Sequence, residues 1–166
     1  MFQLRPHQQR GLDAMLKHLK GQLIMPTGAG KTPTMIFDAK HQFDNSDETL
    51  IVVVAPRILL AEQLSSEFLE FITNASVMHV HTGETHHYSS TNPGVIRNWV
   101  HNIRGNKMIF TTYNSLRRVQ QANIHVNTIY FDEAHNSVKK SFFESTEYFS
   151  DSADRCYFFT ATPKHS

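Results

Sequence analysis

The sequence contains very little cysteine, since Cys156 is the one such residue among 166. A single thiol excludes an intramolecular disulfide and a cysteine-based zinc site. Long apolar runs are also missing: the longest, over residues 50–56, is far too short to span a bilayer. The first residues lack the apolar core of a secretory signal. These absences favour an intracellular, cytoplasmic protein with no membrane partner.

Acidic residues are absent from the middle of the chain. Residues 85–131 contain no Asp or Glu but five Arg and Lys, so this stretch contributes +5 to a net charge of +1 and the remainder contributes −4. A basic surface is typical of proteins that bind a polyanion such as nucleic acid. A solvated face with acidic partners elsewhere in the fold explains the same pattern, so charge alone leaves both interpretations open.

Helix and strand patterns alternate along the chain, whose length and 40% hydrophobic content predict one globular domain, residues 1–166. Helices are expected over 5–20, 31–43, 58–73, 95–104, 114–121 and 141–149. Strands are expected over 22–25, 49–55, 76–81, 107–111, 127–131 and 155–160, with a loop over 88–94. The alternation predicts an α/β fold with a mostly parallel sheet, and functional groups at the carboxyl ends of its strands.

A glycine-rich segment lies between the first predicted strand and the following helix. Its residues are Thr27, Gly28, Ala29, Gly30, Lys31 and Thr32. The glycines permit a backbone that directs N–H groups at a phosphate, and the helix N-terminus adds partial positive charge. Lys31 can reach the terminal phosphates, and the Thr32 hydroxyl can bind Mg²⁺. Met25 stands where the strict phosphate-loop pattern has glycine.

An acidic pair, Asp132 and Glu133, directly follows the apolar strand predicted over 127–131. Asp132 can bind Mg²⁺, which prefers oxygen ligands, and Glu133 can orient or deprotonate an attacking water. An acidic pair alone is usually a solvated strand end. Together with a phosphate loop it predicts a catalytic site for a Mg²⁺-nucleotide that contains Lys31, Asp132 and Glu133.

The ordered motifs resemble those of the first RecA-like motor domain of superfamily 2 helicases and translocases. The matching segments are 4–8, 25–32 (motif I), 52–63 (motif Ia), 110–116 (motif Ib), 132–135 (Asp-Glu-Ala-His, motif II) and 160–163 (Thr-Ala-Thr-Pro, motif III). They are most similar to motor subunits of type I and type III restriction enzymes and to phage or repair helicases. The resemblance implies a RecA-like three-layer fold, ATP and Mg²⁺ as cofactors, and DNA rather than RNA as partner.

The resemblance also assigns roles to single residues. Arg5 and Gln8 belong to the element that would bind adenine. Four residues would contact the backbone of a nucleic-acid strand: Arg57, Thr112, Tyr113 and Ser115. Three others would couple nucleotide state to strand binding: His135, Thr160 and Thr162. Several of these residues also have a simpler structural interpretation. Gln8 could lie on the surface of a helix, residues 111–115 could cap the following helix, and residues 160–162 could form an ordinary strand end.

The motor of this family closes ATP between two RecA-like domains, and the second domain supplies an arginine finger worth about 10³–10⁵ in rate. This sequence ends at Ser166, directly after motif III. We therefore expect an ATPase that is nearly inactive without a second RecA-like domain, in cis or on another chain. The alternatives are a non-catalytic nucleotide- or nucleic-acid-binding module, an RNA helicase domain, and an unrelated nucleoside triphosphatase or kinase.

Two further features lie outside these motifs. His79 and His81 alternate onto one face of a predicted strand, but the sequence offers no third metal ligand at a suggestive spacing. The turn at 81–84 fits either a nucleic-acid loop or an ordinary glycine turn. Trp99 fits the core of a helix-covered sheet better than a base-stacking surface.

Overall fold

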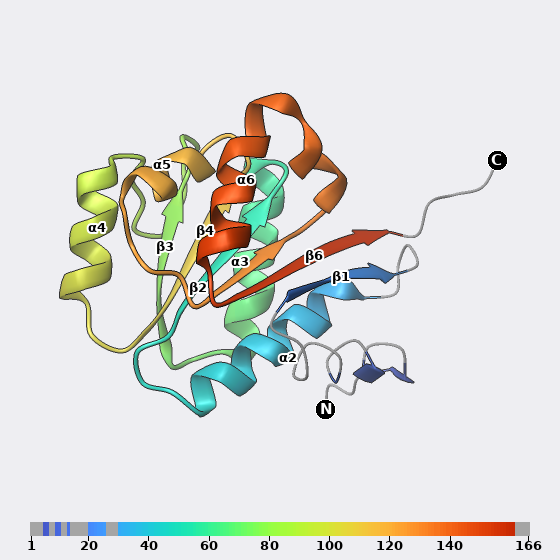
Figure 1. Cartoon of the computed structure of the whole chain (residues 1–166). Helices are drawn as coiled ribbons and strands as arrows, with labels where there is room; N and C mark the ends of the chain where they lie inside the picture. The colour runs from blue at the N-terminus through green and yellow to red at the C-terminus, as the bar shows by residue number, and fades with distance from the viewer. Residues whose placement is uncertain (1–4, 7–8, 11–12, 14–19, 26–29, 162–166) are drawn as a thin grey trace.

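The structure is a computed structural model that describes residues 5–6, 9–10, 13, 20–25 and 30–161 (Figure 1). Its strands form one sheet of six, in the order β1-β6-β5-β2-β4-β3, and every neighbouring pair is parallel. The strands are β1 (Lys20–Met25), β2 (Leu50–Ala55), β3 (Ala75–Val80), β4 (Asn106–Thr112), β5 (Thr128–Phe131) and β6 (Arg155–Ala161). The predicted parallel α/β sheet is therefore confirmed.

Helices cover both faces of this sheet, which gives the predicted three layers (Figure 1). They are α2 (Lys31–Asp44), α3 (Ile58–Phe71), α4 (Pro93–Asn102), α5 (Leu116–Gln121) and α6 (Lys140–Ser152), with a 3-10 turn η1 (Ala134–Val138). Helices α2 and α3 pack on one face, and α4, α5 and α6 pack on the other.

Strand β2 shows why a continuous apolar run suits the centre of such a sheet. Val52 and Val54 enter the core under α4, α5 and α6, whereas Ile51 and Val53 enter the core under α2 and α3. All four side chains have no solvent exposure. A strand buried on both faces must be apolar at successive positions, which is the pattern that predicted it.

Two predicted boundaries need correction, and one element was not predicted. Lys20 begins β1 and is not the end of a helix; most of the helix expected over 5–20 lies outside the described residues. Helix α4 begins at Pro93 within the expected loop, because the Asn92 side chain accepts hydrogen bonds from the next turn's N–H groups and proline suits the first helical position. The turn η1 was not predicted. Trp99 lies in the core, as expected.

Candidate nucleotide site and nucleic-acid groove

The phosphate-loop lysine and the acidic pair meet at the carboxyl edge of the sheet. Lys31 is the first residue of α2, directly after Gly30, whose left-handed φ of 76° favours glycine. The Lys31 Nζ lies 3.1 Å from Oδ1 of Asp132 and also donates a hydrogen bond to Oε1 of Glu133. The structure therefore brings together the three side chains for which the sequence predicts a shared catalytic site.

For both Lys31 and Asp132, burial and the neighbouring opposite charges shift the pKa in opposite directions. The Asp132 carboxyl is almost fully buried, and burial raises its pKa although the Lys31 ammonium counteracts this. Burial also disfavours the Lys31 ammonium, but the hydrogen bond to Glu133 and the charge of Asp132 outweigh it, so the pKa of Lys31 is raised. Lys31 is thus held as a cation that faces two carboxyl groups.

Asp132 retains an oxygen that the described residues do not satisfy. Its buried Oδ1 accepts no hydrogen bond from them, although the Lys31 ammonium lies near it. A buried carboxylate oxygen without a donor is costly unless a cation or water completes its shell. This donor chemistry fits a hard divalent cation such as Mg²⁺.

Glu133 adopts a backbone conformation that is uncommon for its residue type. Its φ of 50° and ψ of 57° lie in the left-handed region, and it precedes η1. Such a conformation costs of order 1–3 kcal/mol in a non-glycine residue and is concentrated at functional sites. The strain turns the chain sharply after β5 and leaves the half-buried Glu133 carboxylate beside Lys31.

The remaining predicted nucleotide and coupling residues divide into two groups. Gln8, Thr27, Gly28, Ala29 and Thr162 lie outside the described residues, so their predicted roles remain predictions. The others are described: Arg5 is exposed, Thr32 is half-buried in the first turn of α2, His135 is exposed in η1, and Thr160 is half-buried in β6. The Nδ1 of His135 lies 3.8 Å from Glu133 Oε2, which places it beside the acidic pair.

The predicted strand-contacting residues line one groove of about 590 Å³. Arg57, Thr112, Tyr113 and Ser115 all contribute to it, and they come from the ends of β2 and β4. The sequence motifs did not select Thr82, Arg117 and Arg118, which also line the groove. Arg117 and Arg118 belong to the stretch without acidic residues, so the charge pattern indicated these two groove residues although the sequence motifs did not.

Tyr113 connects the groove to the acidic pair. Its side chain is 2% exposed, and its hydroxyl donates a hydrogen bond of 2.7 Å to the backbone carbonyl of Asp132. Burial raises the pKa of this hydroxyl far above its ordinary value, so it stays a donor. Thr112 Oγ1 accepts a hydrogen bond from the Ser115 N–H, an arrangement that shapes the turn before α5. The nucleic-acid contacts of these residues stay predictions.

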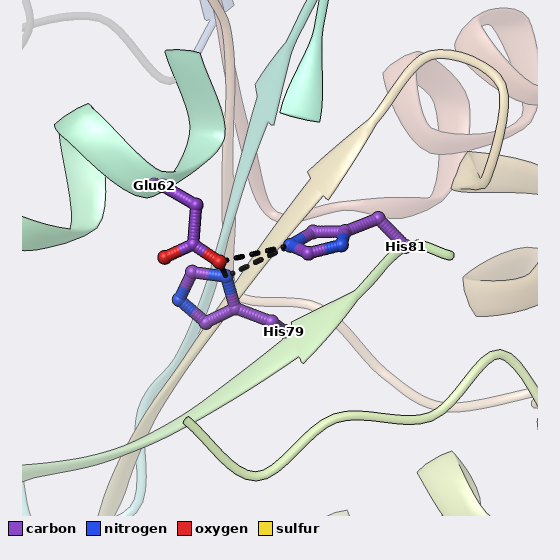
Figure 2. Close-up of side chains that lie close together, drawn as sticks. All are labelled: Glu62, His79 and His81. Atoms are coloured by element: carbon purple, nitrogen blue, oxygen red, sulfur yellow. Dashed lines mark hydrogen bonds and ion pairs between the residues drawn. The ribbon is translucent and has the colours of Figure 1, made fainter. Parts of the chain in front are cut away.

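A third cluster lies at the end of β3, where His79 and His81 face Glu62 of α3 (Figure 2). The sequence offers no third ligand at a suggestive spacing, and the structure supplies one by bringing the Glu62 carboxylate to the two histidines. Sequence spacing could not reveal Glu62: it lies on a helix that crosses over the sheet before β3 begins. Burial lowers the pKa of His79 to about 4 and also lowers that of His81.

The chain is similar to solved structures of a restriction-modification enzyme, a helicase and an ATPase core. A nuclease-deletion mutant of the Type ISP restriction-modification enzyme LlaGI matches with a TM-score of 0.81 and 23% identity, over 99% of this chain and 18% of that one. The UvsW helicase from bacteriophage T4 matches with a TM-score of 0.73 and 14% identity, over 96% of this chain and 52% of the helicase chain. The Sulfolobus solfataricus SWI2/SNF2 ATPase core matches with a TM-score of 0.63 and 19% identity, over 98% of this chain and 32% of the ATPase chain.

These likenesses and the sheet order show that the chain has a RecA-like α/β fold. Residues 1–165 match the sequence family described as "Type III restriction enzyme, res subunit", and the chain belongs to that family. No curated protein sequence matches it. The chain spans less than a fifth of the LlaGI enzyme. Within the described residues, no helix is long and apolar enough to cross a bilayer.

Proposed function

We propose that this domain is the ATP- and DNA-binding half of an ATP-driven DNA helicase or translocase motor. The observation that carries the proposal is the contact of Lys31 with both Asp132 and Glu133 across 101 and 102 residues of sequence. A lysine at the start of a helix, facing two carboxyl groups at the end of a neighbouring strand, is the arrangement that Mg²⁺-nucleotide hydrolysis needs.

Mg²⁺-ATP would be held by groups at the carboxyl edge of the sheet. Lys31 and the N–H groups at the start of α2 would bind the phosphates, while Thr32 and Asp132 would hold the cation. When bound, Mg²⁺ neutralises charge on the phosphates. The buried Oδ1 of Asp132 supports this assignment, because it lies beside the Lys31 ammonium but accepts no hydrogen bond from the described residues. Arg5 and Gln8 would contact the adenine, a proposal that rests on the family resemblance.

Glu133 would act as the group that orients and deprotonates water. Its carboxylate is bonded to Lys31 here, so phosphate binding would draw the lysine away and release an acceptor beside the reacting phosphoryl group. The strained backbone of Glu133 supports this role, because it fixes the carboxylate at the edge of the site.

The groove would hold one strand of DNA through its backbone. Arg57, Arg117 and Arg118 supply positive charge, and Thr82 and Ser115 supply hydroxyl groups that can bond phosphate oxygens. DNA is favoured over RNA because the LlaGI structure is a complex with a DNA substrate mimic and the Sulfolobus ATPase core is in complex with dsDNA. The hydrogen bond between Tyr113 and Asp132 would link the bound strand to the bound nucleotide.

Turnover would require a second RecA-like domain, in cis or on another chain. Lys31 is the one cation that contacts the acidic pair among the described side chains, apart from the titratable His135. Phosphoryl transfer in this mechanistic class uses a further cation, commonly an arginine finger. The domain alone is therefore expected to bind Mg²⁺-ATP with very slow hydrolysis.

Nucleotide binding provides the test of this proposal. Lys31→Ala should abolish binding of a fluorescent ATP analogue in the presence of Mg²⁺, because the phosphates lose their main cationic partner. The matched control is Lys40→Ala, since Lys40 lies on the same helix and is half-exposed beside Asp44. Equal affinity in Lys31→Ala and Lys40→Ala, in two variants that both fold, would overturn the proposed site.

A further inference from the structure

Three potential metal ligands converge at the end of β3. His79 Nδ1 and His81 Nε2 lie 3.2 Å apart, and Glu62 Oε1 lies 3.5 Å and 3.4 Å from them (Figure 2). Both histidines are buried, at 0% and 3% exposure. The buried Glu62 Oε1 accepts no hydrogen bond from the described residues. Two imidazole nitrogens and an unsatisfied carboxylate oxygen thus point at one another away from bulk solvent.

The spacing of these three atoms suits a tetrahedral metal ion. Zinc bonds of about 2.0–2.1 Å at tetrahedral angles place neighbouring ligand atoms about 3.3–3.4 Å apart. An octahedral ion with bonds of about 2.1 Å would bring them to about 3.0 Å. The observed separations of 3.2, 3.4 and 3.5 Å fit the tetrahedral case. Two histidines and one glutamate are an established ligand set for zinc.

The histidine ligands have partners on their opposite ring nitrogens. His79 Nε2 lies 3.0 Å from Ser65 Oγ, which in turn lies 3.2 Å from His87 Nε2. A proton on His79 Nε2 would be accepted by Ser65, which leaves the Nδ1 lone pair directed at Glu62 and His81. Such an outer hydrogen bond fixes the ring orientation of metal-binding histidines.

We propose that Glu62, His79 and His81 form a zinc-binding site with three protein ligands, in which one bound water would complete the tetrahedron. The site is separate from the nucleotide pocket and does not depend on the proposed motor function. It joins α3, whose first residue Ile58 lines the groove, to the end of β3, which is followed by the groove residue Thr82.

Zinc binding would change two hydrogen bonds: the one between His79 Nδ1 and His81 Nε2, and the one at Nδ1 of His81. The Gly83 N–H donates to Nδ1 of His81 at 3.1 Å, so in the neutral ring the proton is on Nε2, the proposed ligand atom. A metal on Nε2 moves that proton to Nδ1. Two N–H groups, those of His81 Nδ1 and of Gly83, then face each other, so the turn between these residues must rearrange. Gly83 packs against Ile58, and both Ile58 and the adjacent Thr82 line the groove. Metal occupancy therefore alters one wall of the groove.

Titration of the metal-free chain with Zn²⁺, and with Co²⁺ as a spectroscopic probe, tests the site without nucleotide or DNA. We expect one ion per chain and the intense visible absorption of tetrahedral Co²⁺. Glu62→Gln and His81→Asn should each remove that absorption and weaken Zn²⁺ binding at least tenfold. Ser65→Ala, which removes the partner of His79, should weaken it by roughly 10–100-fold while the coordination stays tetrahedral.

His86→Asn serves as the matched control. His86 lies in the segment that follows β3, as His81 does, but it is exposed and does not belong to the cluster. Circular dichroism identifies variants that fail to fold, and Glu62→Gln is the least disruptive because Glu62 is half-buried and the side chains have the same shape. The proposal is overturned by the absence of a stoichiometric site, by an octahedral Co²⁺ spectrum, or by unchanged affinity in folded Glu62→Gln. A failure here leaves ATP binding by the Lys31 site unaffected, so the two proposals are tested separately.

Discussion

The hydroxyl of Tyr113 donates a 2.7 Å hydrogen bond to the backbone carbonyl of Asp132, 19 residues further along the chain. Tyr113 lies in the wall of the groove, and Asp132 is the residue that we propose holds the cation of the nucleotide site. If nucleotide binding moved the backbone of Asp132, this hydrogen bond would therefore transmit the movement directly to Tyr113 in the groove.

Tyr113→Phe should destabilise the domain by about 1 kcal/mol, because the buried carbonyl of Asp132 loses its side-chain donor. The variant should also reduce the stimulation of ATP turnover by DNA when a second motor domain is present. Urea unfolding and a DNA-dependent ATPase assay measure the two effects. Tyr88→Phe is the control, since Tyr88 is 54% exposed. Equal losses of stability in both variants would argue against the proposed link.

Glu133→Gln should keep Mg²⁺-ATP affinity and lower ATP turnover by roughly 10²–10⁴-fold, since the amide cannot accept a proton from water. The assay needs an assembly that includes a second RecA-like domain. Glu144→Gln on the exposed side of α6 provides a control with the same chemical change. Turnover at the parental rate in Glu133→Gln would remove this residue from the proposed mechanism.

Arg57→Ala and Arg117→Ala should weaken DNA binding to a similar degree for all sequences, because arginines that contact phosphates position a strand without base readout. Each substitution should reduce the slope of log affinity against log salt by about 1. Fluorescence anisotropy over a salt series measures this slope. Arg97→Ala is a suitable control: Arg97 is exposed on α4 and does not line the groove. A slope reduced equally by all three substitutions would contradict a localised groove.

Glu48 should stabilise the domain at neutral pH but not in acid. Hydrogen bonds from the Gly105 N–H and from Lys107 lower the pKa of Glu48 below its ordinary value of 4.5. The unfolded chain then binds a proton more readily than the folded chain, so this stabilisation is present above the unfolded pKa and is lost as pH falls through the folded pKa. Urea unfolding should show Glu48→Gln less stable than the parent at pH 7, with the difference shrinking in acid. A difference that does not change with pH contradicts the prediction.

The sequence by itself determined the layered fold and the meeting of Lys31 with the acidic pair. Apolar strands such as 50–55 must be buried on both faces, so the parallel sheet followed from the pattern of residues. Parallel strands end at one edge of a sheet, so Lys31 and Asp132 could be expected to meet although 101 residues separate them. Local signals failed at element ends, as at Pro93, where a capping side chain one residue earlier decides the start of the helix.

Only the tertiary structure decided which side chains from different elements face one another. Glu62 joins His79 and His81 because α3 packs over the sheet beside β3, and no spacing along the chain encodes that contact. The burial of Tyr113 and the position of Arg117 in the groove likewise depend on how α5 follows β4. Periodicity fixes the faces of helices and strands, whereas the packing of one element on another fixes the partners of each side chain.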